Sequence, residues 1–195
     1  MRSAIVLSVL LAATGAANAQ FFGTTAYANG DWEAAAGPNI VTHDVIFNAG
    51  PLAPNTPFDL GNGVSLTVNG PGGSSDTLGF TFNFVPGETT QVTITFDTAI
   101  TAFAWNHFNS FADGGITVST GFNSYDVEGL SGGGVIGFVG VVEAQAFNTI
   151  TFTLTNPAQP DLWFIDSPFR YAPVPAPATG AALAAAALFT TRRRR

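Results

Sequence analysis

Two stretches of alternating sequence decide the fold: Gln91-Val92-Thr93-Ile94-Thr95-Phe96 and Thr149-Ile150-Thr151-Phe152-Thr153-Leu154-Thr155. In both, every second residue is apolar and the residues between are threonine or glutamine. This period of two is typical of a β-strand that buries one face and exposes the other. We therefore expect two strands with their apolar side chains inside and a row of hydroxyls outside.

The pattern continues on both sides of these stretches. Comparable runs predict strands at 41–47, 64–68, 78–85, 100–108, 116–120, 124–127, 135–142 and 162–171. Glycine- and proline-rich breaks at 69–73, 86–87, 113–115 and 131–134 supply the turns between them. Residues 32–36 allow at most one helical turn before Gly37-Pro38. The sequence predicts an all-β, jelly-roll-like antiparallel sandwich of about ten strands.

The N-terminus has the three parts of a secretory signal peptide. A basic start at Arg2 is followed by an apolar run, 4–13, and then by Ala17-Asn18-Ala19 before Gln20. Small residues at Ala17 and Ala19 are what signal peptidase requires, so we expect cleavage between Ala19 and Gln20. A short buried helix of the mature domain is the alternative.

The C-terminus combines a proline-rich spacer, a weakly apolar stretch and a basic end. The stretch 178–191 has 14 residues, about 21 Å as a helix, whereas the hydrocarbon core is ~30 Å thick. A helix of this length is shorter than the hydrocarbon core and is therefore a poor permanent transmembrane span. The predicted division is a signal peptide at 1–19, a β-sandwich domain at 20–172 and a tail at 173–195.

This tail resembles the PEP-CTERM sorting signal of Gram-negative bacteria that make exopolysaccharide. The matching residues are Val174, Pro175, Ala176, Pro177, Ala178, Thr179 and the terminal Arg192, Arg193, Arg194 and Arg195. Ala176 stands where the family motif has glutamate. The resemblance implies sorting to the cell surface, transient anchoring in the inner membrane and removal of the tail by an exosortase. An ordinary tail anchor is the alternative.

The second half of the domain also resembles PEP-CTERM ectodomains of lectin-like architecture. The runs that carry this likeness include Gly137-Phe138-Val139-Gly140-Val141, Ala146-Phe147-Asn148-Thr149-Ile150, and Trp163-Phe164-Ile165-Asp166. The resemblance implies a non-enzymatic exported surface or matrix protein.

Composition excludes several kinds of chemistry. The chain has no cysteine and no lysine, so disulfides, thiolate metal sites and Schiff-base chemistry are ruled out. All 13 acidic residues lie between Asp31 and Asp166, where no lysine or arginine occurs. Such a surface repels nucleic acid, which is bound through basic side chains.

Three candidate sites remain in the central domain. Trp105, with Asn106 and His107 beside it, is the candidate exposed aromatic for binding carbohydrate. Asp161 and Asp166 are candidate ligands of a structural calcium ion; no other cofactor is expected. Asp126 and Glu128 are two residues apart on one predicted strand face, a spacing that would suit the acid pair of a glycoside hydrolase, and Asp31 and Glu33 have the same spacing.

These observations rank three functions. An exported, non-enzymatic surface or extracellular-matrix protein comes first, with extracellular polysaccharide among its partners. A carbohydrate-binding or adhesion module is the alternative. A carboxylate-pair hydrolase comes last, because two-residue spacings of acids also arise on any solvated strand.

Overall fold

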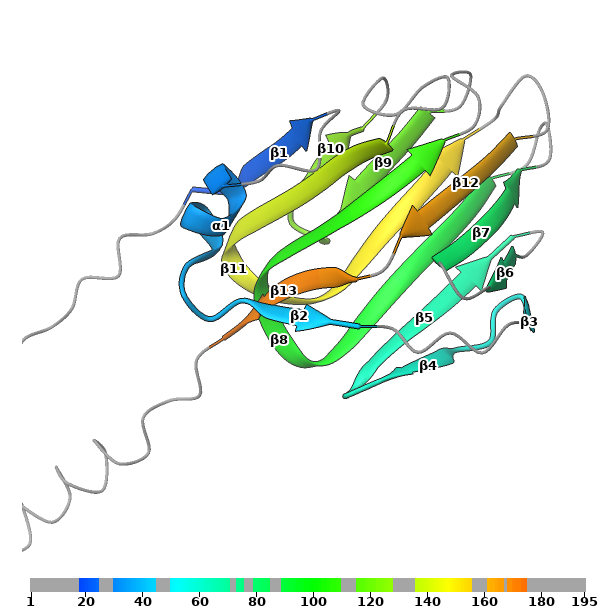
Figure 1. Ribbon diagram of the computed structural model, residues 1–195, viewed down its shortest axis with the longest axis horizontal. Coiled ribbons are helices and arrows are strands. Elements are labelled where there is room, and N and C mark those ends of the chain that lie inside the picture. The colour runs from blue at the N-terminus through cyan, green and yellow to red at the C-terminus, as the bar shows by residue number, and fades with distance from the viewer. Residues whose placement is uncertain are drawn as a thin grey trace, which may run out of the picture.

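The computed structural model describes residues 18–24, 30–44, 50–70, 73–75, 79–84, 89–109, 115–127, 136–155, 161–166 and 168–174. These residues form thirteen antiparallel strands and one helix (Figure 1). The helix is α1 (Gly30–Ala36), and the strands are β1 (Gln20–Thr24), β2 (Val41–His43), β3 (Gly50–Leu52), β4 (Phe58–Gly61), β5 (Val64–Asn69), β6 (Gly73–Ser75), β7 (Gly79–Phe84), β8 (Thr89–Asn109), β9 (Gly115–Ser119), β10 (Ser124–Asp126), β11 (Ile136–Thr155), β12 (Asp161–Asp166) and β13 (Phe169–Pro173).

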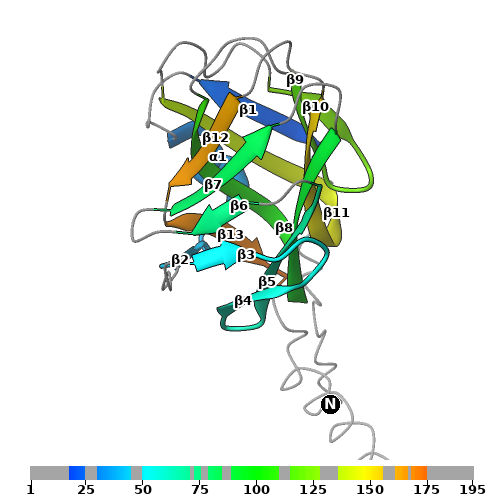
Figure 2. The same ribbon diagram turned by 90° about the vertical axis from the view of Figure 1, so that its right-hand side faces the viewer.

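The strands lie in two layers, which are separated in the side view of Figure 2. The back sheet has the order β4-β5-β8-β11-β9-β10. The front sheet has β1, β11 and β8 side by side, then β12, β7, β6 and β3, with β13 and β2 beside the lower part of β8. The predicted all-β antiparallel sandwich is confirmed.

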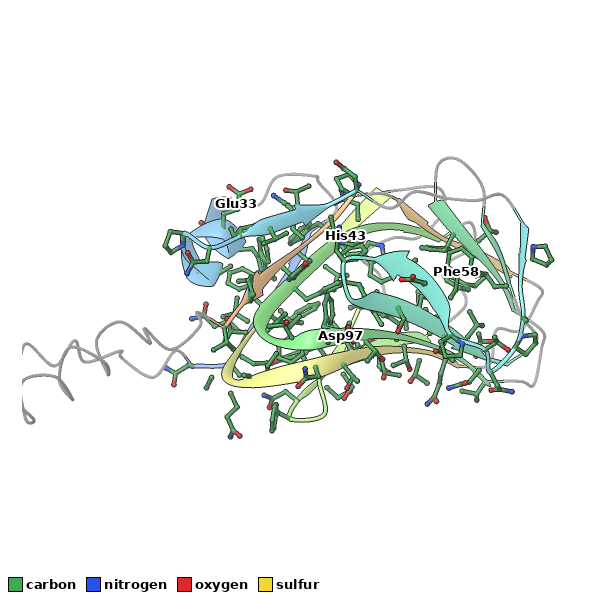
Figure 3. The ribbon with its side chains drawn as sticks, turned by 90° about the horizontal axis from the view of Figure 1, so that it is seen from below. Glu33, His43, Phe58 and Asp97 are labelled. Carbon is green, nitrogen blue, oxygen red and sulfur yellow. The ribbon has the colours of Figure 1, made fainter. Side chains whose placement is uncertain are left out.

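Both sheets share the two longest strands. β8 and β11 bend from one layer into the other, and their pairing shifts register between Val142 and Phe147 and again between Phe147 and Thr149. Extra residues on one strand of a pair bend it and increase its twist, which is how strands change sheets at a sandwich corner. Figure 3 shows the two limbs of β8, with Asp97 on the lower limb.

The core lies between the sheets and follows the predicted alternation. In the back limb of β8, Val92, Ile94 and Phe96 are buried, while Thr93 and Thr95 are partly exposed. A group of aromatic side chains fills the bend, where Phe103 contacts the rings of Phe96, Trp105, Phe152 and Phe169. Burial of these rings is the main stabilising contribution.

Helix α1 covers part of the outer side of the front sheet. Its first turn carries Asp31 and Glu33. Their negative charges are stabilised by the positive end of the helix dipole. Gly37, with φ of +85°, ends it by donating its N–H to the Glu33 carbonyl. The helix has seven residues, so the prediction of at most one turn was wrong.

Trp32 is the side chain that joins α1 to the sheet. It is fully buried, its Nε1 donates to the Val141 carbonyl at 3.3 Å, and its ring meets Phe138 edge to face. The sheet makes room with Gly140, where an added Cβ would lie 2.5 Å from Trp32 Cδ1. A second hydrophobic cluster, separate from the inter-sheet core, forms around this ring.

Strand bounds differ from the sequence prediction in three ways. The runs 91–96 and 100–108 belong to one continuous strand, as do 135–142 and 149–155, while 162–171 contains two strands. Strands β1, β3, β4 and β6 were not predicted. The last strand reaches Pro173, one residue beyond the predicted domain boundary. Among the described residues, no helix is long and apolar enough to cross a membrane.

Candidate functional site

The outer side of the back sheet is a continuous hydroxyl- and amide-bearing surface, which we call the hydroxyl face. Four neighbouring strands supply its side chains: Ser65, Thr67 and Asn69 from β5, Gln91, Thr93 and Thr95 from β8, Thr149, Thr151 and Thr153 from β11, and Thr117 and Ser119 from β9. All are at least partly exposed. Paired residues of adjacent strands lie on the same side of a sheet, so these residues form rows across it.

The central row shows how regular this face is. Thr67, Thr93, Thr151 and Ser119 are consecutive register partners across four strands. The hydroxyls of Thr93 and Thr151 are 3.2 Å apart and share a hydrogen bond. Strands are spaced about 4.8 Å apart, so the row offers a hydrogen-bonding group at each such step.

The hydroxyl face carries no charged side chain. In a chain with 13 acidic residues, none falls within 65–69, 91–95, 117–119 or 149–153, and of the acids that the structure describes Asp59, Asp97 and Asp126 lie at the margins of the face. A hydroxyl both donates and accepts. The face can therefore hydrogen-bond a neutral polar polymer without desolvating a charge.

A pocket opens at the end of the sandwich where the chain leaves β13. It has a volume of about 120 Å³, and it is lined by Val41, Asn62, Gly63, Val64, Phe96, Thr98, Tyr171 and Pro173. Asn62 and Gly63 form the tight β4–β5 turn, with φ of +53° and +73°. These two positive angles are those of a two-residue Asn-Gly hairpin.

A buried carboxylate at the bend of β11 is hydrogen-bonded to the β9–β10 hairpin. Glu143 is 3% exposed, and it accepts hydrogen bonds from Thr120 Oγ1 at 2.5 Å, Asn123 Nδ2 at 2.7 Å and the Tyr125 hydroxyl at 3.3 Å. Burial raises the pKa of Tyr125 above its ordinary value of 10.0, and the nearby Glu143 charge raises it further. Because both Glu143 oxygens are occupied and shielded from solvent, this group is structural.

Both ends of the domain lie at one end of the sandwich. Gln20 pairs with Val142, Val142 with Ala102, and Ala102 with Ala172, so the first and last strands share a row across the front sheet. Val174 continues the last strand by donating its N–H to the Ala99 carbonyl at 2.9 Å. The first residue of the predicted sorting motif, Val174, is therefore hydrogen-bonded to the folded domain.

The structure describes only part of the predicted processing signals. Ala19 and Gln20 are exposed, immediately at the start of β1, and Val174 is 37% exposed. The remaining residues of both signals, including Ala17, 175–179 and 192–195, lie outside the described residues.

The prediction that Trp105 is an exposed ligand-binding aromatic was wrong. Its side chain is 3% exposed and its ring contacts Phe103 and Phe152 in the core. Neighbouring residues of a strand point to opposite faces, so the polar Asn106 says nothing about the surroundings of Trp105. Asn106 is half-buried, and the His107 side chain lies outside the described residues.

The structure does not bring the predicted acidic residues together. Asp31 and Glu33 lie on a helix, not a strand, and Glu33 forms an ion pair with Arg170 at 2.5 Å. Asp126 is exposed on β10, while Glu128 lies outside the described residues. Asp161 and Asp166 stand at the two ends of β12, and their backbones are roughly 16 Å apart at ~3.3 Å per residue. The described ranges contain no group of three His, Asp or Glu side chains placed to hold a metal ion.

Sequence reasoning predicted the outward threonines but missed the pocket. The Gly61-Asn62-Gly63 run is a hairpin signal that would have placed the β4–β5 turn. Nothing in the sequence brings Val41, Thr98 and Tyr171 to that turn, because their proximity depends on the pairing of β13 with β2 and β8.

Comparisons with known proteins found structural likeness only. No protein-family model and no curated protein matches the chain. A family 29 carbohydrate-binding module from Piromyces equi is 11% identical, with a TM-score of 0.46, and the match covers 69% of this chain and 92% of that one. A variant of a second family 29 module, complexed with mannohexaose, is 17% identical with a TM-score of 0.45, covering 64% of this chain and 93% of that one.

Proposed function

We propose that this chain is a non-enzymatic protein of the cell envelope of an exopolysaccharide-producing Gram-negative bacterium. Signal peptidase removes residues 1–19 during export, and the C-terminal segment holds the protein transiently in the inner membrane until an exosortase removes it. The mature domain is then retained at the surface or in the extracellular matrix, where it binds neutral polysaccharide.

The observation that best supports tethering is the position of Val174. Its hydrogen bond to Ala99 leaves only the three residues 175–177 between the sheet and the apolar stretch 178–191. Proline-rich chain would span ~3.1 Å per residue if extended, or roughly 9 Å for three residues. The end of the sandwich that holds Val174 and Gln20 would therefore face the membrane, and the opposite end would face away.

A charge change in the tail tests the sorting proposal. Replacing Arg192, Arg193, Arg194 and Arg195 with asparagine removes the cytoplasmic positive charge that fixes the orientation of a short apolar helix. We expect loss of surface retention and tail removal in the native host, with the β-sandwich still folded by circular dichroism. Replacing Arg170 with asparagine is the control, because it removes an arginine from the domain and leaves the tail intact. Unchanged processing of the four-arginine variant would contradict sorting.

The hydroxyl face supports the polysaccharide-binding part of the proposal. A sugar polymer presents hydroxyls on its rim and C–H groups on its ring faces, and each threonine offers one hydroxyl and one methyl group. The absence of charge on this face favours a neutral polymer. The chain has a formal net charge of −7 and no lysine, so it would repel acidic polymers. The extent of the face suits a chain lying across several strands.

Removing two central hydroxyls tests this surface. The substitutions Thr93→Val and Thr151→Val keep shape and strand preference but delete the hydrogen-bonding groups. We expect the full-length protein to lose about tenfold in affinity for neutral polysaccharide, since two hydrogen bonds of about 0.7 kcal/mol each correspond to that factor. Affinity electrophoresis through gels containing β-glucan, galactomannan or the host exopolysaccharide measures it.

The matched control removes two exposed threonine hydroxyls that lie away from the hydroxyl face, by Thr42→Val and Thr56→Val. These substitutions should leave migration in the gels unchanged. Equal retardation of the wild-type protein and of the Thr93/Thr151 variant would rule out the hydroxyl face as the binding surface. Absence of retardation by every polysaccharide would rule out the binding function itself.

A further inference from the structure

We infer that the pocket beside Tyr171 binds a single neutral pyranose ring, as the terminal residue of a glycan. This inference takes the ligand class from the proposed function but assigns it to a second site. The pocket lies at the end of the sandwich, between β2, the β4–β5 turn, the bend of β8 and β13, whereas the hydroxyl face is the outer side of the back sheet.

Tyr171 provides a fixed aromatic wall. Its ring is half-buried and lies 5.1 Å from the Phe96 ring, 6.2 Å from Phe169 and 6.3 Å from His43, measured between centroids. His43 is itself held by a 3.0 Å hydrogen bond between Nε2 and the Leu60 carbonyl. A ring so held loses little freedom on binding, which favours stacking against the C–H face of a sugar.

Three neutral polar groups around this wall are available to a ligand. Within the described part of the chain, the side chains of Asn62, Thr98 and Tyr171 make no hydrogen bond to protein. The hairpin turn fixes the backbone of Asn62 between two glycines that also have positive φ. An amide and two hydroxyls can each donate and accept, as sugar hydroxyls require.

The charge near the pocket excludes acidic ligands. Asp97 is exposed beside the β4–β5 turn, and its carboxylate oxygen lies 3.0 Å from where a Cβ on Gly63 would be. Among the residues that the structure describes, no basic side chain lines the pocket. A uronic acid or a phosphate would therefore be repelled, whereas a neutral hexose would not.

The volume selects one ring. About 120 Å³ is slightly less than the ~150 Å³ cavity known to accommodate benzene, so the pocket holds no more than one six-membered ring, and the substituents of that ring must reach solvent. The exposed Val41 and the half-buried Pro173 give the pocket lining an apolar part. Two adjacent sugar rings do not fit in this volume, which favours the single terminal ring of a glycan.

Protein-observed NMR titration of the full-length protein tests the inference. The probes are methyl β-glucoside, methyl α-mannoside and methyl β-galactoside, with methyl glucuronide as the acidic counterpart. We expect at least one neutral glycoside to shift resonances of Asn62, Thr98 and Tyr171, with no shift from the glucuronide. Shifts confined to the hydroxyl face, or none at all, would overturn the inference.

Asn62→Gly is the decisive variant because glycine tolerates the positive φ at this position and lacks only the amide. It should weaken glycoside binding about tenfold, the loss expected when up to two hydrogen bonds disappear. Asn55→Gly is the matched control, since Asn55 is exposed with φ of +57° and lies outside the pocket. Equal affinities for the two variants would contradict the site.

Two further results separate the possible occupants and the two proposals. A peptide with the sequence of residues 174–179 that binds the pocket more tightly than every glycoside would assign it to the tail and overturn the sugar inference. Retardation by polysaccharide that Asn62→Gly leaves intact, together with no glycoside binding, would refute the pocket while the hydroxyl face stands.

Discussion

Replacing Phe103 with alanine is expected to lower the free energy of unfolding by about 3–5 kcal/mol. Phe103 is fully buried at the bend of β8, and its ring lies 5.6 Å from Trp105, 5.7 Å from Phe169 and 6.0 Å from Phe96. Alanine would remove the contacts at the centre of this aromatic group and leave a cavity that rigid neighbours cannot fill. Chemical denaturation followed by circular dichroism measures the change.

Phe122→Ala provides the matched control for this prediction. Phe122 is 50% exposed in the turn that follows β9, so its removal should change the free energy of unfolding by no more than about 0.5 kcal/mol. Similar losses at the two positions would mean that the bend of β8 is not the packing centre of the domain.

Trp32→Ala is the second substitution with a large expected effect, again about 3–5 kcal/mol. It removes a fully buried indole, its hydrogen bond to the Val141 carbonyl, and the surface over which the Arg170 guanidinium lies 5.2 Å from the ring centroid. Helix α1 has only seven residues, too few to be stable alone, so it depends on this contact.

A double-mutant cycle identifies the cause of that loss. Gly140→Ala alone should destabilise by about 1–3 kcal/mol, because its methyl group would overlap Trp32. In the Trp32→Ala background the same change should cost less, since one of the two overlapping rings is gone, while Phe138 Cε1 still lies 2.7 Å from the added Cβ. Strictly additive effects would show that Trp32 does not occupy the space above Gly140.

The sequence predicted the back sheet better than the front sheet for a physical reason. In the back limbs of β8 and β11 one face is buried and the other is solvated, so the alternation of threonine with apolar residues is visible. In the front limb of β8, Ala102, Phe103, Ala104 and Trp105 are all buried. Alternation is lost there because the inter-sheet core covers one face and α1 covers the other.

The prediction of site residues from the sequence was limited in the same way. The hydroxyl face could be anticipated, since outward threonines follow from period-two patterning, but its rows depend on register between strands far apart in sequence. Trp105 was misplaced because its polar neighbour in sequence was taken as a neighbour in space. Phe103, two residues before it and on the same face, was the better guide to its environment.

The central claim, that the chain is exported and sorted by its two ends, is tested most directly by mass spectrometry of the mature protein isolated from the surface of its native host. The account predicts an N-terminal peptide that begins at Gln20, and no peptide that contains Arg192 to Arg195. Mature surface molecules that keep Met1 and the four terminal arginines would contradict it. If only the arginines remain, export stands and the tail is an ordinary anchor.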